Sequence, residues 1–360
     1  MTPQIAVEAS AAPVEPARRA EILDNPGFGQ YFTDHMFVAE WTPTDGWHGA
    51  TVKPYGPFSI DPACAVLHYA QEIFEGTKAY RHDDGSLWLF RPESNAERFA
   101  RSAARMALPQ LPASLFVSAI EALVRVDADW VPAGGEKALY LRPFMFASEV
   151  YLGVRPSKHV TFAVIASPAG AYFGGGVRPV SIWLSEEYSR AAPGGTGAAK
   201  CGGNYAASLL AQQEAIVNGC DQVVFLDAAE HLAVEELGGM NIFLVYKDGT
   251  LVTPELTGSI LEGVTRASVI ELARELGHKV DERRVTIDEW RRGLADQEIS
   301  EVFACGTAAV ITPISSLRWR GGEVSCADDA GAVTSKIRER LLDIQYGRAD
   351  DVHSWMHPLT

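Results

Sequence analysis

The stretch Gly194-Gly195-Thr196-Gly197-Ala198-Ala199-Lys200-Cys201-Gly202-Gly203-Asn204-Tyr205 sets one lysine among glycines and alanines and runs directly into a helical pattern. Glycine allows the backbone a positive φ and a close approach to a bound group. A lysine held in this way and partly desolvated can lose its proton near neutral pH and form a Schiff base with a carbonyl compound. The alternative is a flexible surface loop with a solvated lysine, so the rest of the chain has to supply partners.

Two kinds of nucleotide-binding loop do not fit this segment. A Walker A loop needs glycine directly before its lysine and serine or threonine directly after it. Ala199 and Cys201 occupy these places. The dinucleotide fingerprint fails as well, because Gly195-x-Gly197 is followed at the third position by Lys200. The sequence therefore disfavours a P-loop protein.

Bulk properties indicate a globular chain that is long enough for two domains. The 360 residues carry a net charge of −15, which repels nucleic acid and anionic membrane surfaces. No apolar run approaches the roughly 18–20 residues that cross a bilayer. The five cysteines are an odd number without a C-x-x-C pair, and no histidine pair has metal-ligand spacing. We therefore expect a cytoplasmic protein without a metal, a nucleic-acid partner or a membrane partner.

Patterning along the chain predicts a mixed α/β (α+β) fold in two domains. We expect a mobile N-terminal tail over residues 1–22, a smaller α/β domain over 23–170, an interdomain linker over 171–179 and a larger domain over 180–360. Strand patterns and helical patterns alternate in both halves. Strands are predicted over Ser86–Phe90, Leu139–Arg142, Val160–Ala166, Gln222–Asp227, Asn241–Tyr246, Thr250–Thr253 and Ile299–Cys305, and helices over Ala96–Leu108 (capped by Asn95), Tyr205–Asn218 (capped by Asn204) and Val264–Leu276.

An acidic pair, Glu235-Glu236, lies in a second Gly-rich turn directly before a predicted strand. An acid at this place can simply cap a turn. It can also keep a heteroaromatic nitrogen protonated, which is what a pyridoxal phosphate (PLP) ring requires to act as an electron sink. A lysine and an acid in separate Gly-rich turns favour the second interpretation more than either residue alone.

A phosphate would need a binding site, and two turns could provide one. Gly263-Val264-Thr265-Arg266 opens a predicted helix, whose free N–H groups and positive dipole end suit an anion. Gly306-Thr307-Ala308-Ala309 offers small residues and a hydroxyl after the last strand. Each can also be an ordinary helix start or turn.

Two arginines add candidate anion ligands. Arg98 is predicted in the first turn of its helix, where a cation opposes the helix dipole unless an anion neutralises it. The alternative is a solvated arginine paired with Glu93 or Glu97. In Tyr140-Leu141-Arg142-Pro143 the arginine either pairs internally or binds a ligand carboxylate. Aromatic side chains that could line the same pocket, or belong to the core, are Tyr69, Phe74 and Tyr172.

Together these segments resemble the branched-chain amino-acid aminotransferases, which are PLP enzymes of fold type IV with a two-domain, D-amino acid aminotransferase-like fold. The similarity runs from about Trp41 to Tyr346, and its motifs occur in the family's order. They are Leu67-His68-Tyr69, Phe74-Glu75-Gly76-x-Lys78-Ala79-Tyr80, Tyr140–Pro143, Gly194–Tyr205, Glu236–Asn241, Gly263–Arg266 and Gly306-Thr307-Ala308.

The resemblance implies a role for each candidate residue. Lys200 would carry PLP and act in catalysis, Glu236 rather than Glu235 would face the pyridine nitrogen, and Tyr205 would hydrogen-bond the ring oxygen. Phosphate binding is implied for Arg98, Gly263, Val264, Thr265, Gly306 and Thr307. Substrate binding is implied for Tyr69, Phe74, Tyr140, Arg142, Tyr172, Thr307 and Ala308.

The activity implied is reversible ping-pong amino transfer between L-leucine, L-isoleucine or L-valine and 2-oxoglutarate, in a homodimer of amino-acid biosynthesis. A D-amino acid aminotransferase or an aminodeoxychorismate lyase of the same fold group is the alternative, and a non-enzymatic PLP-carrying protein is a more distant one. Two departures from the family pattern stand out. Gly239 replaces a threonine of some members, and Ala309-Val310-Ile311-Thr312 replaces the redox-active C-x-x-C of the animal enzymes.

Overall fold

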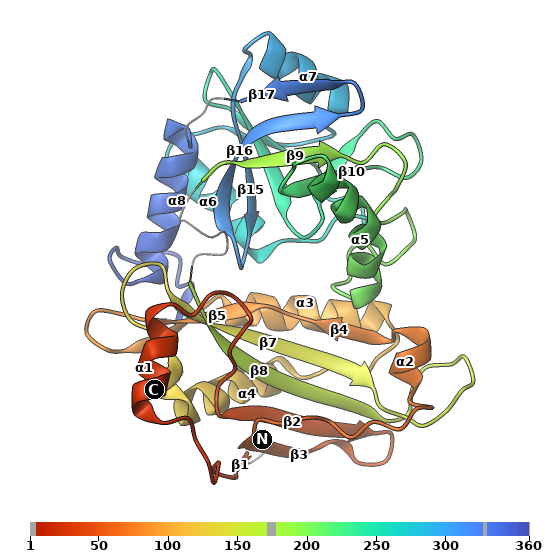
Figure 1. Cartoon of the computed structure of the whole chain (residues 1–360), viewed down its shortest axis with the longest axis vertical. Helices are drawn as coiled ribbons and strands as arrows, with labels where there is room; N and C mark the ends of the chain where they lie inside the picture. Colours follow the sequence, from red (N-terminus) through yellow and green to blue (C-terminus); the bar gives the residue numbers. More distant parts are fainter. Residues whose placement is uncertain (1–4, 171–177, 327–329, 360) are drawn as a thin grey trace. The chain divides into compact units, whose positions relative to one another are not determined.

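The computed structural model describes residues 5–170, 178–326 and 330–359. By contacts the chain divides into two compact units, each drawn with its own sheet in Figure 1. The first comprises Met1–Gly174, Ala199–Gly202 and Ile344–Thr360, and the second comprises Gly175–Ala198 and Gly203–Asp343. Two segments that the sequence suggested for the larger domain, 199–202 and 344–360, therefore belong to the first unit. The predicted linker falls mainly on residues 171–177, outside the described ranges.

The first unit is built on a sheet with the strand order β1-β3-β2-β8-β7-β5-β6-β18, in which β4 pairs with β7. Apart from the parallel pair β1 and β3, its strands pair antiparallel. Its elements are β1 (Ala6–Val7), α1 (Pro16–Asp24), β2 (His35–Thr42), β3 (Gly46–Pro54), α2 (Ala65–Tyr69), β4 (Glu72–Phe74), β5 (Thr77–Arg81), β6 (Leu87–Phe90), α3 (Pro92–Arg105), α4 (Ala113–Val126), a 3-10 turn (Ala128–Trp130), β7 (Ala138–Ala147), β8 (Val160–Ala169) and β18 (Met356–Pro358).

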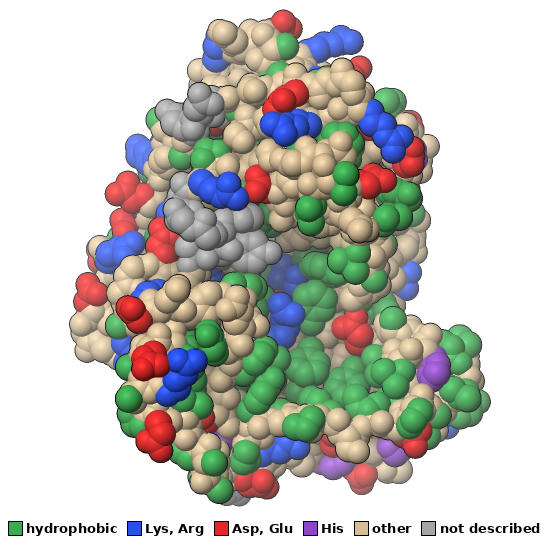
Figure 2. All heavy atoms as spheres, in the orientation of Figure 1, with side chains coloured by type: hydrophobic (Ala, Val, Ile, Leu, Met, Phe, Trp, Pro, Cys, Tyr) green, Lys and Arg blue, Asp and Glu red, His purple; other side chains and the backbone are tan. Residues whose placement is uncertain are grey.

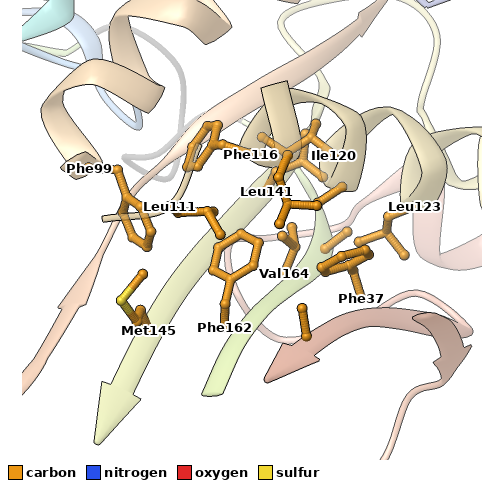
Figure 3. Packing of buried hydrophobic residues seen from close by; sticks show 14 of the residues in the cluster. Phe37, Phe99, Leu111, Phe116, Ile120, Leu123, Leu141, Met145, Phe162 and Val164 are labelled. Atoms are coloured by element: carbon orange, nitrogen blue, oxygen red, sulfur yellow. The ribbon is translucent and has the colours of Figure 1, made fainter. Parts of the chain in front are cut away.

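The core of this unit forms where α4 covers the sheet (Figure 3). Phe116, Ile120 and Leu123 recur at helical spacing and are fully buried. They face Phe162 and Val164, which alternate along β8 and so point to the same side of the sheet. Burial of each such side chain contributes about 1.5–3 kcal/mol relative to its exposed state.

The N-terminal segment is more structured than the sequence predicts. From residue 5 onward it forms β1 and α1 rather than a mobile tail. The amide of Ser10 donates to Nε2 of His35 over 2.9 Å, and that of Val14 donates to Oδ1 of Asp34 over 2.8 Å. These long-range hydrogen bonds hold a segment whose composition alone suggests mobility.

The second unit has a mixed sheet in the order β11-β10-β9-β16-β15-β12-β13-β14, with β17 paired to β16. Its elements are β9 (Val180–Leu184), α5 (Gly202–Val217, which begins in the first unit), β10 (Gln222–Leu226), β11 (Val234–Leu237), β12 (Asn241–Tyr246), β13 (Leu251–Thr253), α6 (Val264–Glu275), β14 (Val280–Glu282), α7 (Ile287–Ala295), β15 (Ile299–Gly306), β16 (Val310–Trp319), β17 (Gly322–Ser325) and α8 (Ala332–Gln345). The mixed α/β class predicted from the sequence is confirmed.

Local chemistry explains several of these elements. Phe243 and Phe303 face each other on β12 and β15, with stacked rings 5.1 Å apart, a stabilising cross-strand pair. Thr286 caps α7 by accepting the amide of Glu289 over 3.1 Å. Gly249 has φ +83°, which the predicted turn between β12 and β13 requires. On the face drawn in Figure 2, acidic and basic side chains are interspersed.

Two predicted helix starts are late, by four residues for α3 and by three for α5. Helix α3 begins at Pro92, the residue type favoured at the first helical position, after Arg91 in the left-handed region. Asn95, predicted to cap it, lies inside the helix. Helix α5 begins at Gly202, and Asn204 lies in its first turn. Both asparagine side chains make tertiary hydrogen bonds instead, Asn95 to Glu75 and Asn204 to Thr196.

Candidate active site

Lys200 is fixed by its backbone in the first unit. Its N–H donates to the hydroxyl of Ser102 on α3 over 3.0 Å, and its carbonyl accepts the amide of Phe74 over 2.9 Å. The ammonium nitrogen lies 4.7 Å from the centre of the Phe74 ring. Lys200 is therefore no solvated lysine on a flexible loop, and the alternative interpretation of this segment is wrong.

The surroundings of Lys200 favour its neutral form. Burial lowers the pKa of the Lys200 amine to about 8, and the positive charge of Arg98 acts in the same direction, whereas Glu75 opposes both. At mildly alkaline pH a substantial fraction of the amine is then unprotonated. Such an amine can act as a nucleophile or accept a proton.

The partner of Arg98 is a carboxylate that the sequence reasoning missed. Glu75 is fully buried, and Arg98 donates to it twice, from Nε to Oε1 over 2.7 Å and from a terminal nitrogen to Oε2 over 2.8 Å. The predicted alternatives for Arg98 are both wrong, because Glu93 pairs with His357 and Glu97 is exposed. A signal was available, since Glu75 interrupts a stretch of apolar and small residues.

Tyr140, Arg142 and Phe74 form one cluster beside Lys200. A terminal nitrogen of Arg142 donates to the hydroxyl of Tyr140 over 3.2 Å, and the guanidinium carbon lies 4.9 Å from the centre of the Phe74 ring. Nε of Arg142 is buried and has no hydrogen-bond partner among the described residues. An unpaired guanidinium N–H is suited to a carboxylate ligand.

Gly76 is required by this cluster. The Tyr140 hydroxyl lies where a Cβ at position 76 would be placed, so any larger residue would clash with the aromatic ring. Glu72, on the preceding strand, accepts the amide of Gly202 just after Lys200. The motif Phe74-Glu75-Gly76 thus carries a ring beside the lysine, a buried charge and a space for the tyrosine.

The second unit holds the acidic pair, and its two members differ. Glu236, 2% exposed, forms an ion pair with Arg190 and accepts the amide of Leu261 over 2.9 Å. Glu235 accepts the hydroxyl of Ser259, and burial raises the pKa of its carboxyl. Glu236 is therefore the member that forms a direct ion pair with a buried cation, and Arg190 is a second buried partner that the sequence reasoning missed.

Arg190 also anchors the Gly-rich segment. Its guanidinium donates to the carbonyl of Gly197 over 3.1 Å and to that of Ser259. Gly197 packs so closely on Ser259 that a side chain at that position would clash with the backbone. This glycine serves backbone packing rather than space for a ligand.

The two predicted phosphate turns lie in the second unit. Helix α6 begins after Gly263, and no side chain of the described residues caps it, so its first N–H groups are available to an anion. Gly263 has no room for a side chain because Asn241 lies against it. Thr265 is buried in the first turn beside Val264.

The turn of the β15–β16 hairpin follows Gly306 and contains Thr307 and Ala308. It ends at Val310, whose φ of +60° is unusual for a β-branched residue and marks local strain. Strain of this kind persists only where surrounding structure holds it. Such sites are common next to functional groups.

The remaining predicted residues fall in three places. Tyr205 lies on α5, 3.5 Å from where a Cβ would be placed on Gly239. Tyr69 ends α2, and its hydroxyl donates to the carbonyl of Leu152 in the loop after β7. Tyr172 lies outside the described residues.

Within the described ranges, no group of three or more histidine, cysteine, aspartate or glutamate side chains could hold a metal ion. In the same ranges, no helix is long and apolar enough to cross a membrane. Neither search adds a second candidate site.

Comparisons with known proteins agree with one another. The family described as amino-transferase class IV matches residues 72–317. A probable branched-chain-amino-acid aminotransferase of Streptomyces coelicolor is 57% identical over 360 residues, covering 99% of each chain.

Two solved structures are similar as well. The branched-chain amino acid aminotransferase of Escherichia coli has a TM-score of 0.75 and 29% identity, covering 89% of this chain and 99% of its own. The enzyme of that name from Thermobaculum terrenum, solved in its PLP form, has a TM-score of 0.72 and 25% identity, covering 92% and 100%. The chain accordingly belongs to the class IV aminotransferases and, within them, to the branched-chain-amino-acid aminotransferases.

Proposed function

We propose that this aminotransferase moves the amino group of L-leucine, L-isoleucine or L-valine to 2-oxoglutarate with PLP bound at Lys200. The observation that carries the proposal is the amine of Lys200, held against the Phe74 ring with its pKa lowered to about 8. Related proteins bear the name of this activity, and one was solved in its PLP form.

The residues present suit such a cofactor. Glu236, paired with Arg190, would hold the pyridine nitrogen protonated, and Tyr205 would hydrogen-bond the ring oxygen. The uncapped start of α6 at Gly263, Val264 and Thr265 offers backbone N–H groups to a phosphate. Further phosphate ligands would come from Arg98, Gly306 and Thr307. When bound, PLP supplies an electron sink for the α-carbon of an amino acid.

The protein's own groups would perform the proton transfers and the orientation of substrate. The free amine of Lys200 would take the proton from the α-carbon of the substrate and return it at C4′ of the cofactor, which a pKa near 8 favours. Arg142, through its unpaired Nε, would bind a substrate carboxylate, together with Tyr69, Tyr140, Thr307 and Ala308.

One pocket has to accept an aliphatic chain and a γ-carboxylate. The Phe74 ring offers apolar surface to the first, and Arg142 lies 4.9 Å from that ring and can pair with the second. Because an ion pair forms only with the acidic substrate, the same wall can serve both. Tyr172 remains a predicted member of this wall.

The experiment is an amino-donor panel with 2-oxoglutarate, run on wild type, Lys200→Ala and the control Lys279→Ala. We expect activity with L-leucine, L-isoleucine and L-valine, a near-ultraviolet cofactor absorbance in wild type, and loss of both in Lys200→Ala alone. Activity confined to D-alanine would favour a D-amino acid aminotransferase. An absorbance that survives Lys200→Ala would contradict the role of this lysine.

We also propose a homodimer located in the cytoplasm. Exposed apolar side chains lie on α2 and in two loops of the first unit, before α2 and after β7, where the amide of Tyr151 donates to the carbonyl of Ala63 over 3.1 Å. They include Ile60, Leu67, Val150, Leu152 and Val154, with exposures between 41% and 85%. Clustered exposed apolar residues mark association surfaces. All five cysteines are free, which suits a reducing compartment. Sedimentation of wild type against Val154→Asp tests the dimer.

A further inference from the structure

Glu75 is a buried charge next to Lys200 that has no part in the proposed reaction. Its carboxylate is fully buried and accepts four hydrogen bonds. Two come from Arg98, over 2.7 and 2.8 Å, one from the Asn95 amide over 2.9 Å, and one from the Gly76 backbone over 3.1 Å. A carboxylate with this many donors is held in one orientation and in its charged form.

Burial and the neighbouring charges have opposing effects on the pKa values of Glu75 and Lys200. Burial raises the pKa of the Glu75 carboxyl, but Arg98, Lys200 and Asn95 together bring it below its ordinary value. For Lys200 the signs are reversed. Burial lowers the pKa of its amine, and Arg98 and, less strongly, Arg142 act in the same direction, whereas Glu75 and, less strongly, Tyr140 raise it. Arg98 and Glu75 therefore act on the lysine in opposite directions.

Glu75 also restricts Arg98 mechanically. Two of the guanidinium nitrogens are engaged by one carboxylate, in the bidentate geometry that fixes the plane of an arginine. An arginine fixed in this way keeps its charge at a constant distance from the lysine. Without the carboxylate, the cation would be both unbalanced and less restrained.

We propose that Glu75 is a positioning residue that fixes Arg98 and offsets its charge, and so sets the pH at which Lys200 becomes a neutral amine. This inference rests on the proposed role of Lys200 as the proton carrier. It adds the residue that controls when Lys200 can act. Glu75 itself touches neither substrate nor cofactor in this scheme.

The test measures the lysine directly, on the full chain freed of cofactor. Trace labelling with acetic anhydride across pH 6–11, read by mass spectrometry of the peptide containing Lys200, gives the midpoint for its reactivity. Because the labelling requires no cofactor, its result does not depend on the donor panel. The labelling can contradict the role of Glu75 while the panel supports the proposed function, and it can support that role while the panel contradicts the function. The proposal and the proposed function are thus separable.

Three variants carry the argument. Glu75→Gln removes the charge and should move the midpoint down by about one pH unit. Glu75→Asp keeps the charge and should stay near the wild type. The double variant Glu75→Gln with Arg98→Met removes both opposing charges and should return the midpoint toward wild type. Glu40→Gln, a partly buried carboxylate that is bonded to Thr161 in the same unit, is the control and should change nothing.

A purely structural role would not produce shifts of opposite sign. A Glu75→Gln midpoint that equals or exceeds the wild-type value overturns the proposal, as does a double variant that lies below the single one. If Glu75→Gln does not fold, Arg98→Met is compared with the double variant. The midpoint should be lower in the double variant, and equal midpoints would again overturn the proposal.

Discussion

Each unit of this chain contains a buried glutamate–arginine pair, and the two pairs are built differently. In the first unit, Arg98 gives two nitrogens to the single carboxylate of Glu75, next to Lys200. In the second unit, Arg190 is shared between Glu236 and two backbone carbonyls. Both carboxylates also accept a backbone amide. We call the first pair closed, because one carboxylate accepts two nitrogens of the same guanidinium, and the second shared, because its arginine also binds backbone carbonyls. Two buried ion pairs of the same residue types can therefore be held in place by different sets of partners.

The largest loss of stability is expected when one partner of the closed pair is removed. Arg98→Ala leaves the fully buried Glu75 carboxylate without its cation, which should cost about 3–5 kcal/mol of unfolding free energy. Urea unfolding followed by circular dichroism measures it. Arg98→Met with Glu75→Leu should recover most of that loss, because neither charge then remains buried. A double variant as unstable as the single one would contradict this account.

Changes to the shared pair should affect the catalytic rate. Glu236→Gln removes the carboxylate proposed to hold the cofactor nitrogen and should lower kcat by about 10²–10³-fold, the scale of losing one electrostatic contact. Steady-state kinetics with L-leucine and 2-oxoglutarate measure it. Glu235→Gln is the matched control, since burial already raises the pKa of that carboxyl toward its neutral form. Equal losses in both variants would remove the distinction between the two acids.

The two units also differ in how much space a glycine leaves beside a tyrosine ring, and Gly76 in the first unit leaves none. Gly76→Ala places a methyl group onto the Tyr140 ring and should cost about 1–3 kcal/mol in stability, as overpacking does. We expect KM for the amino donor to rise as well, because Tyr140 would have to move away from Arg142. Thermal unfolding and KM for L-leucine are the readouts. Wild-type values in both would show that this ring has room.

The smallest effect is expected at Gly239. A Cβ there would lie 3.5 Å from Tyr205, an ordinary contact distance, so the threonine of other family members should fit. We expect Gly239→Thr to change stability by less than about 0.5 kcal/mol and to leave KM for L-leucine nearly unchanged. Both are measured beside Gly76→Ala. A larger change would mean that the second unit is as tightly packed around Tyr205 as the first is around Tyr140.

Sequence patterns predicted the family and part of the secondary structure, but they left out β2, β3, β16, α4 and α8 among other elements. Period-2 alternation and turn residues located β6, β10, β12 and β15 to within one or two residues. Such signals depend only on residues that are close together in the sequence, so they can be recognised without knowing the fold. The mixed fold follows from the order in which they occur.

What the sequence did not reveal are contacts between distant positions. Arg98 and Glu75 are 23 residues apart, and Lys200 reaches Ser102 across 98. Asn95 and Asn204 look like helix caps by residue type, yet tertiary partners use their side chains. Spacing alone cannot distinguish the two uses, because both begin with a polar residue near a helix start.

The four residues Ala199–Gly202 belong to the first unit, although the chain on both sides of them belongs to the second. The chain thus passes from the second unit into the first and back again within four residues, and one of these residues is Lys200. A fragment ending near residue 170 would keep Ser102, Phe74 and Glu75 but lose Lys200, and the complementary fragment would carry the lysine without them. Chimaeras that exchange units between relatives would therefore need to graft this short segment to match its host.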